Sequence, residues 1–401
     1  MGTVELYKPH PKQLEIHKAI ADLPAKYYSV PIGRQFGKTL LGENQALKWG
    51  IDNSWKVGWV SPTYKQCKKV YKEIKNAVQG SPILKRSNDS DLIIELLTGG
   101  TIVFYSAEAY DGIRGETFDA LIMDEFAFYK REAWTEVLKA TVLVKGKKVL
   151  ALSTPRGKNH FFEFNSRHLT DDNYVSIAGS SYDNPFIDRK EIEDARRNLP
   201  DHIFRQEYMA EFLEDGSGVF VNVKECIKPA ASEGIYAGID LGRADDYTVL
   251  TITDSDNNEI YCERWRHMNW SDIISKVVTN LNKYKAKTYV EANGAQDAIY
   301  EQIRDKVNYG KNNIQPFVTT SKSKQSIVED LIVEFENQEI GILGHDWQLG
   351  ELEAFAYEYN PRSRQIKYSA PVGLHDDYVM SRAICSRARK DLKSTGVYLI
   401  R

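Results

Sequence analysis

The stretch Pro31-Ile32-Gly33-Arg34-Gln35-Phe36-Gly37-Lys38-Thr39 decides how the fold of this sequence is interpreted. It follows a short apolar run, 27–30, and opens a segment whose apolar residues have helical spacing. A strand, a glycine-containing loop and a helix start form the context of a P-loop, in which successive backbone N–H groups surround phosphates. The loop residues that would bind the phosphates here are Gly33, Arg34, Gln35 and Gly37.

Two side chains complete this predicted site. Lys38 would reach the β- and γ-phosphates, and the Thr39 hydroxyl would bind Mg²⁺. The usual pattern places a glycine where this chain has Ile32, and Gly33 follows one place late. The stretch therefore predicts a variant P-loop, which other motifs of the chain must support.

Composition is that of an ordinary globular protein. The chain has 401 residues, 42% of them hydrophobic and 27% charged, and this length predicts two domains. The formal net charge of −3 means that any contact with nucleic acid must come from local patches. The four cysteines are far apart in the sequence, which argues against a zinc ribbon or a disulfide scaffold and suits a reducing cytosol. Because no apolar run approaches the ~18 residues of a membrane span, we expect a cytosolic protein without a membrane partner.

A second motif for phosphate chemistry is Ala-Leu-Ile-Met-Asp-Glu at 120–125. An apolar strand that ends in two carboxylates is the Walker B arrangement. Asp124 would hold the Mg²⁺ shell, and Glu125 would orient and deprotonate the attacking water. An apolar strand with a polar exit is the plainer interpretation. The order of the two motifs favours a nucleotide-hydrolysing α/β domain whose ligands gather at the ends of the strands.

Four further residues are candidates for the same site. The strand 148–152 ends next to Thr154, which would sense the γ-phosphate. Arg34 and Arg114 are alternative candidates for stabilising the charge of the transition state, and either could instead be a solvated loop arginine. Gln13 could bind the adenine edge or belong to an ordinary helix cap.

Helical segments are predicted at 188–198 and 200–213, and the pattern changes after the polar stretch 214–218. Three strands are predicted at 235–241, 247–253 and 259–266, followed by a helix at 271–284 and a strand at 288–291. Three consecutive strands, then a helix and a strand, is the ribonuclease H-like order. We therefore predict a first domain at 1–214, a linker at 215–232 and a second domain at 233–401.

Carboxylates lie where a nuclease of that fold needs them. Asp240 is on the first strand of this domain, Glu291 ends the fourth, and Asp376 and Asp377 start the last helical segment. Cleavage of a phosphodiester by two metal ions needs hard oxygen ligands that hold cations about 4 Å apart. Asp240 on an apolar strand would be a costly buried charge without a cation. We assign the helix cap to Asp376 and the main ligand role to Asp377, and retain both as metal candidates.

Two pairs of residues in this half allow either of two interpretations. Asp245 and Asp246 could be accessory ligands or turn residues, and we favour the turn. Lys322 and Lys324 lie in a predicted polar loop, where they could contact DNA phosphates or remain solvated.

The ordered set of motifs resembles the large terminase subunit that packages DNA in tailed double-stranded DNA bacteriophages. In that family Arg and Gln precede the second glycine of the Walker A motif, which accounts for Ile32. The stretches that carry the resemblance are 9–13, 34–39, 112–125, 153–157, 182–185, 206–208 and 219–220, together with Asp240, Glu291 and Asp377.

The resemblance implies an α/β fold: an N-terminal P-loop (RecA/ASCE-like) ATPase domain with a small lid, then a ribonuclease H-like nuclease domain. It implies an ATPase and metal-dependent endonuclease that uses ATP and Mg²⁺ at one site and two Mg²⁺ or Mn²⁺ ions at the other. Its partners would be double-stranded DNA, the portal protein of the procapsid, the small terminase subunit and further copies in a ring, commonly a pentamer. The chain would act in the host cytoplasm, and Arg114 would act on the ATP of a neighbouring subunit.

Two other functions remain as alternatives at this point. An ATP-dependent helicase–nuclease would need a second RecA-like domain or helicase motifs, whereas the chain after residue 215 turns to the nuclease order. A non-enzymatic DNA-binding scaffold would require Ile32 to disable the P-loop.

Overall fold

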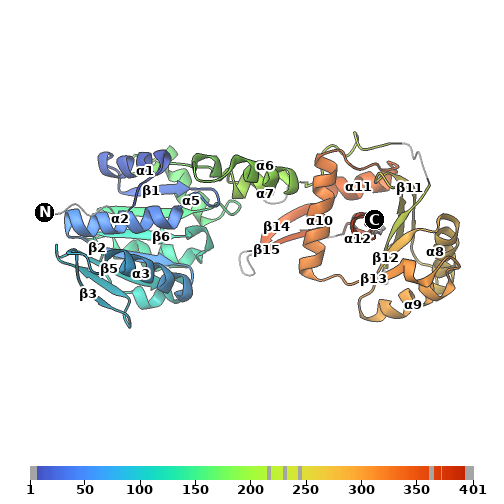
Figure 1. Ribbon diagram of the computed structural model, residues 1–401, viewed down its shortest axis with the longest axis horizontal. Helices are drawn as coiled ribbons and strands as arrows, with labels where there is room; N and C mark the ends of the chain where they lie inside the picture. The colour runs from blue at the N-terminus through green and yellow to red at the C-terminus, as the bar shows by residue number, and fades with distance from the viewer. Residues whose placement is uncertain are drawn as a thin grey trace, which may run out of the picture. The chain divides into compact units, whose positions relative to one another are not determined.

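The computed structural model of the chain describes residues 7–214, 218–228, 233–242, 246–360, 365–371 and 373–392. The chain divides into two compact units (Figure 1). The first comprises Met1–Arg196 and His202–Glu214, and the second comprises Arg197–Asp201 and Asp215–Arg401. Over these described ranges, no helix combines the length and apolar character needed to cross a membrane.

A single sheet organises the first unit, with strands in the order β3-β4-β5-β2-β6-β7-β1-β8. From β5 to β8 all neighbouring strands are parallel. The strands are β1 (Tyr27–Pro31), β2 (Lys56–Ser61), β3 (Leu84–Asn88), β4 (Ile93–Leu96), β5 (Thr101–Ser106), β6 (Ala120–Asp124), β7 (Lys148–Ser153) and β8 (Tyr174–Ser176). The helices up to residue 214 are α1 (Pro11–Asp22), α2 (Lys38–Asn53), α3 (Tyr64–Val78), α4 (Lys139–Thr141), α5 (His160–Ser166), α6 (Arg189–Asn198) and α7 (Asp201–Glu207).

Both faces of this sheet are covered. Along β6, Ile122 packs into the apolar cluster on the α2 and α3 side, and its neighbour Met123 packs into the cluster that contains α5. Every residue of β6 is buried, as expected for a central parallel strand. Strand β7 lies between β1 and β6, so the P-loop, Thr154 and the two Walker B carboxylates all follow strands that end at one edge of the sheet.

The second unit has the predicted ribonuclease H-like sheet, in the order β11-β10-β9-β12-β13. The first three strands are antiparallel, and β12 and β13 run parallel to β9. The strands are β9 (Tyr236–Asp240), β10 (Thr248–Thr253), β11 (Glu259–Trp265), β12 (Lys287–Glu291) and β13 (Ile314–Phe317), with a separate hairpin of β14 (Ala356–Asn360) and β15 (Gln365–Ser369). The helices are α8 (Trp270–Tyr284), α9 (Asp297–Lys306), α10 (Ser321–Glu336), α11 (Asp346–Ala354) and α12 (Asp377–Asp391).

Helix α12 approaches β9 closely at Gly238. A Cβ atom at this position would lie 2.3 Å from both the Ser381 carbonyl oxygen and the Cys385 nitrogen, so only glycine fits. The Ser381 hydroxyl donates to the Gly238 carbonyl over 3.0 Å. This contact places the start of α12 beside the end of β9.

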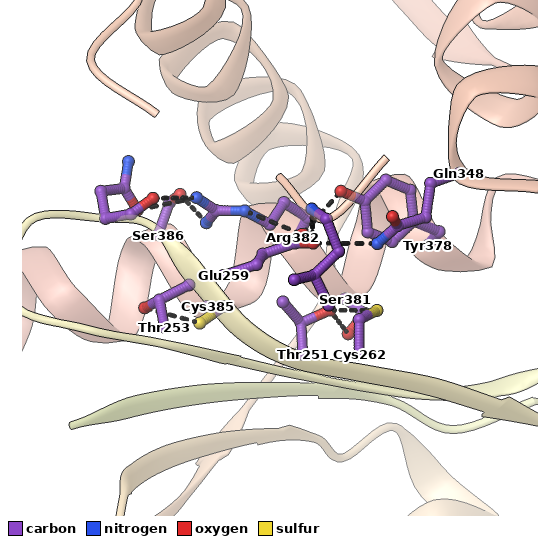
Figure 2. Close-up of polar contacts among 12 residues, drawn as sticks. Thr251, Thr253, Glu259, Cys262, Gln348, Tyr378, Ser381, Arg382, Cys385 and Ser386 are labelled. Carbon is purple, nitrogen blue, oxygen red and sulfur yellow. Dashed lines mark hydrogen bonds and ion pairs between the residues drawn. The ribbon is translucent and has the colours of Figure 1, made fainter. Parts of the chain in front are cut away.

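A fully buried ion pair also anchors α12 (Figure 2). Arg382 and Glu259 are both 0% exposed, and Arg382 Nε lies 3.3 Å from Glu259 Oε1. Arg382 also donates to the Asn257 carbonyl over 2.8 Å, while the Tyr378 hydroxyl and the Gln348 amide donate to the Glu259 carboxylate over 2.6 and 2.9 Å. These bonds join α12 to α11 and to the turn before β11, so they fix the helix that carries Asp377.

Two local predictions are wrong. The predicted loop at 319–325 contains the start of α10, because Thr320 accepts a hydrogen bond from the Ser323 N–H and caps the helix. Lys322 and Lys324 therefore lie in a helical first turn. The helix expected to continue to residue 213 ends at Glu207, whose carbonyl accepts the Arg34 N–H of the P-loop.

We predict that Arg382→Met lowers the free energy of unfolding of the second unit by about 3–5 kcal/mol, because it leaves the Glu259 charge buried without its partner. Arg387→Met is the matched control. It removes an arginine from the same helix whose ion pair with Asp391 is partly exposed and contributes about 0.5 kcal/mol or less. Urea unfolding followed by circular dichroism measures both, and equal effects of the two variants would contradict the role given to the buried pair.

Candidate functional site

The variant P-loop is held in shape by the chain segments that surround it. The Gly33 N–H donates to the Gly179 carbonyl over 2.9 Å, and the Arg34 N–H donates to the Glu207 carbonyl over 2.7 Å. The N–H groups that can face a phosphate are therefore those that follow, at 35–39. Gly37 has a φ of +95° and is the residue before α2, so the loop turns directly into the helix N-terminus.

Packing explains why the first glycine comes one place late. Ile32 is fully buried and continues the strand geometry of β1, with its N–H donating to the Ser153 carbonyl over 2.9 Å. A Cβ atom at Gly33 would lie 2.4 Å from the Tyr208 carbonyl oxygen. The chain segment at Tyr208 thus comes close at position 33, where only glycine leaves room for it. The side chain at position 32 instead packs in the hydrophobic core.

Lys38 lies where three strand ends meet. Its Nζ donates to Thr154 Oγ1 over 2.9 Å and lies 3.5 Å from Glu125 Oε1. Glu125 has a φ of +53°, an uncommon conformation for a residue with a side chain, directly after β6. The structure thus brings together the predicted residues from the P-loop, the Walker B strand and the end of β7.

A pocket of about 650 Å³ opens beside these residues. Its lining includes the predicted Thr39, Asp124 and Glu125, and also Glu43 and Glu73, which the sequence analysis did not identify. Burial, reinforced by the charge of Glu125, raises the pKa of Asp124 to about 7. Burial, followed by a hydrogen bond and charge repulsion from Glu73, raises the pKa of Glu43 to about 8. The position of Glu43 four residues after Thr39 was the available sequence signal, since such residues share a helix face.

Gln13 and Arg34 both contact other protein groups at the P-loop. The Gln13 amide donates to the Gly37 carbonyl over 3.2 Å, which fixes it against the end of the loop. Arg34 Nε lies 2.5 Å from Glu207 Oε2, and the other oxygen of Glu207 lies 2.8 Å from Arg156 Nη1. Glu207 thus pairs with two arginines next to the phosphate loop and offsets only one of their two charges.

Arg114 lies in a different environment. Its side chain is 55% exposed and pairs with Asp111 over 2.9 Å and with Glu136 over 3.6 Å. Within the described chain it does not line the pocket beside Lys38.

In the second unit, strand register brings two predicted carboxylates together. Ile239 of β9 pairs in parallel with Val290 of β12, so Asp240 and Glu291 end neighbouring strands at the same edge. Asp377 is the first residue of α12, and all three line a pocket of about 180 Å³. Burial raises the pKa of Asp240 well above its usual value, with added effects of a hydrogen bond to Glu291 and its charge. Burial likewise raises the pKa of Asp377 to about 6.

Asp376 precedes α12 as predicted but does not cap it with its side chain. Its carboxylate instead lies 2.8 Å from Lys324 Nζ, and both residues line the same pocket. The predicted capping role of Asp376 is therefore wrong, because its side chain pairs with Lys324 and makes no hydrogen bond to the helix N–H groups.

His375 and Gln296 at this pocket were not identified from the sequence, and Asp246 lies with them. His375 Nδ1 lies 3.5 Å from Asp377 Oδ2 and 3.7 Å from Asp246 Oδ1, an arrangement that could hold a metal ion. Asp246, which we favoured as a turn residue, is also placed where it could be an accessory ligand, whereas Asp245 lies outside the described residues. Gln296 is also buried in the lining, and the adjacency of His375 to the predicted aspartates was the one sequence signal available.

The donor atoms of this pocket fit hard divalent cations. Carboxylate oxygens are the ligands of Mg²⁺ and Mn²⁺ in proteins, and imidazole is compatible with the second of these. Gln296 Oε1 is buried and has no hydrogen-bond partner within the described residues, which leaves a further oxygen for a bound water or ion. The first unit offers the Thr39 hydroxyl and Asp124, whose Oδ1 is likewise buried without a partner among those residues.

Comparison with known proteins gives consistent matches. Residues 31–225 match the family described as terminase large subunit, T4likevirus-type, N-terminal. The chain is 28% identical to the large terminase subunit of Thermus virus P23-45, over 94% of this chain and 87% of that protein. It is 30% identical to the large terminase subunit of Escherichia phage T5, over 61% of this chain and 60% of that protein.

A solved structure has the same overall fold. The large terminase of a thermophilic bacteriophage aligns with a TM-score of 0.50 and 14% identity, over 95% of this chain and 99% of that one. The variant P-loop, the Walker B strand end and the ribonuclease H-like carboxylates all lie within this shared architecture. The chain therefore belongs to the large terminase subunits of bacteriophages, DNA-packaging proteins with an ATPase and a nuclease domain.

Proposed function

We propose that residues 1–214 form the ATPase domain that drives DNA translocation, that 233–401 form the nuclease domain that cuts concatemeric DNA, and that 215–232 join them. One observation carries this proposal. Each unit has its own pocket of buried carboxylates at the ends of parallel strands, and only the first pocket adjoins a P-loop lysine. We therefore assign ATP hydrolysis to the first pocket and DNA cleavage to the second.

In the ATPase domain the phosphates bind to the N–H groups of the P-loop and to Lys38. Thr39 and Asp124 hold Mg²⁺, which when bound neutralises charge on the phosphates. Glu125 accepts the proton of the attacking water, and its contact with Lys38 places it within reach of the reacting phosphate. Thr154 accepts a hydrogen bond from Lys38 at the end of β7. Loss of the γ-phosphate on hydrolysis would alter this contact, and Thr154 would transmit that alteration to the end of β7.

The two arginines take different roles. Arg34 is held by Glu207, and we assign it to the phosphate loop of its own subunit. Arg114 is exposed, and we assign it to the ATP of a neighbouring subunit, where it stabilises charge in the transition state. Gln13, bonded to the end of the P-loop, is assigned to the adenine side of the nucleotide.

In the nuclease domain Asp240, Glu291 and Asp377 hold two Mg²⁺ or Mn²⁺ ions. Bound ions of this kind activate a water and stabilise the leaving oxygen of a phosphodiester. Asp376 is a further ligand, and Asp246 and His375, whose donor atoms lie close to that of Asp377, are accessory ligands.

The partners follow from the family. The chain moves double-stranded DNA into a procapsid from a ring, commonly of five copies, on the portal protein, and the small terminase subunit guides it to the DNA. It acts in the host cytoplasm. A helicase–nuclease is disfavoured because the second unit has the ribonuclease H-like sheet and no second RecA-like sheet in its described residues.

For the ATPase, we expect Lys38→Ala to abolish both nucleotide binding and hydrolysis. Glu125→Gln should keep nucleotide binding but lower kcat by about 10²–10⁴-fold, because it removes the proton acceptor. Phosphate release and binding of a fluorescent ATP analogue measure the two effects, with the exposed Glu163→Gln as control. Unchanged hydrolysis in Glu125→Gln would remove this residue from the mechanism.

For the nuclease, we expect Asp240→Asn to abolish Mn²⁺-dependent cutting of supercoiled plasmid, because it removes a buried ligand. Glu125→Gln should cut as the wild type does, since it changes only the other pocket. Agarose gels with and without EDTA give the readout. Cutting that survives in Asp240→Asn would show that the nuclease centre lies elsewhere.

A third variant tests the residues that the sequence did not reveal. His375→Ala should raise the Mn²⁺ concentration needed for half-maximal cutting by about 10–100-fold, because it removes the group that lies between Asp246 and Asp377. The same rate at saturating Mn²⁺ would assign His375 to metal binding. An unchanged Mn²⁺ dependence would exclude it from the metal site.

A further inference from the structure

The pocket beside the P-loop contains more negative charge than a Walker site requires. Its lining includes four carboxylates, those of Glu43, Glu73, Asp124 and Glu125. One lysine of the lining, Lys69, lies 3.7 Å from Glu73 at the exposed rim. The Walker motifs account for Asp124 and Glu125, and they leave Glu43 and Glu73 without a role.

The burial of one Glu43 oxygen is not offset by the described residues. Glu43 is only 8% exposed, and its Oε1 is shielded from water without a hydrogen bond to any of them. The residue lies one turn after Thr39 on α2 and so faces the same side of the helix. Asp124 shows the same feature: it is 5% exposed, with an Oδ1 that no described residue bonds. Buried carboxylate oxygens without bonds are costly, and a cation near both would offset the cost.

The size of the pocket indicates which cation it takes. About 650 Å³ is room for many waters, at ~30 Å³ each. The carboxylate oxygens also do not converge: among the described residues, the one group of three ligand atoms within 4.8 Å of one another is Asp246, His375 and Asp377. Wide spacing suits an ion that keeps its water shell, as Mg²⁺ does when one or two carboxylates bind it.

We propose that Glu43 and Glu73, with Asp124, hold a hydrated divalent cation in this pocket, and that the cation binds without nucleotide. The proposal rests on the assignment of Asp124 to the metal in the proposed ATPase. It extends that site to two carboxylates outside the P-loop and Walker B motifs. Because Glu43 is on α2 and Glu73 on α3, the cation ties α3 to the P-loop helix.

The test is binding of Mn²⁺ alone to the full chain, followed by electron paramagnetic resonance without nucleotide. Using the Asp240→Asn background reduces the contribution of the nuclease pocket. The double variant Glu43→Gln, Glu73→Gln should raise the Mn²⁺ dissociation constant of one site by about tenfold or more. Asp52→Asn, which neutralises an exposed carboxylate of the same helix, should leave it unchanged. Equal Mn²⁺ affinity in the double variant and its background overturns the proposal.

A second readout separates cation binding from a structural role. Added Mn²⁺ should raise the melting temperature of the wild type above its value in EDTA by more than it raises that of Glu43→Gln, because only the wild type keeps the carboxylate that binds the cation. An equal rise in both proteins would mean that Glu43 does not bind the cation, and would overturn the proposal. Glu73 is 44% exposed in its side chain, so Glu73→Gln alone should fold, and it must weaken Mn²⁺ binding.

Failure of the proposed function gives a different result. A wild-type chain that binds Mn²⁺ at this pocket but does not hydrolyse ATP would refute the ATPase and leave the cation site standing. If the chain hydrolyses ATP but its Mn²⁺ binding does not depend on Glu43 and Glu73, the ATPase stands and the proposed cation site is refuted.

Discussion

Taking carboxylates out of water at the ends of parallel strands is the constraint on which both halves of the molecule depend. Asp124 ends β6 and Asp240 ends β9, and every residue of these two strands is buried. Burial raises the pKa of both side chains, because water no longer stabilises their charge. Lys38 lies beside the first pocket, whose exposed rim also has Lys69, and Lys324 lines the second. In the proposed sites divalent cations would supply the remaining positive charge, so one physical need would underlie nucleotide hydrolysis in one unit and DNA cleavage in the other.

Packing far from the chemistry sets the geometry of each pocket. In the first unit, β7 separates β1 from β6 and brings Thr154 to Lys38. In the second, the missing side chain of Gly238 lets α12 rest on β9, and the buried pair of Arg382 with Glu259 also holds the helix. The position of Asp377 is therefore fixed by contacts that no catalytic motif contains. Stability and function are coupled through this helix.

The sequence predicts what short-range patterns encode. Lys38, Thr39 and Asp124 follow from motifs of fixed spacing, and Asp240 and Glu291 follow because strand ends are visible in the hydrophobic pattern. Contacts between distant segments escape such patterns. Arg34 pairs with a carboxylate 173 positions away, and Glu43 meets Glu73 only because α2 and α3 pack on one face of the sheet. The loop predicted around Lys324 was wrong because the cap formed by Thr320 and Ser323 was not recognised.

Anomalous diffraction from crystals of the full chain grown with Mn²⁺ locates each bound ion without relying on activity. We expect Mn²⁺ in two separate places. One lies in the pocket of Thr39, Glu43 and Asp124, and the other lies among Asp240, Glu291 and Asp377. Ions bound only at exposed acidic groups, with both buried pockets empty, would contradict the view that buried carboxylates at strand ends are built to hold cations.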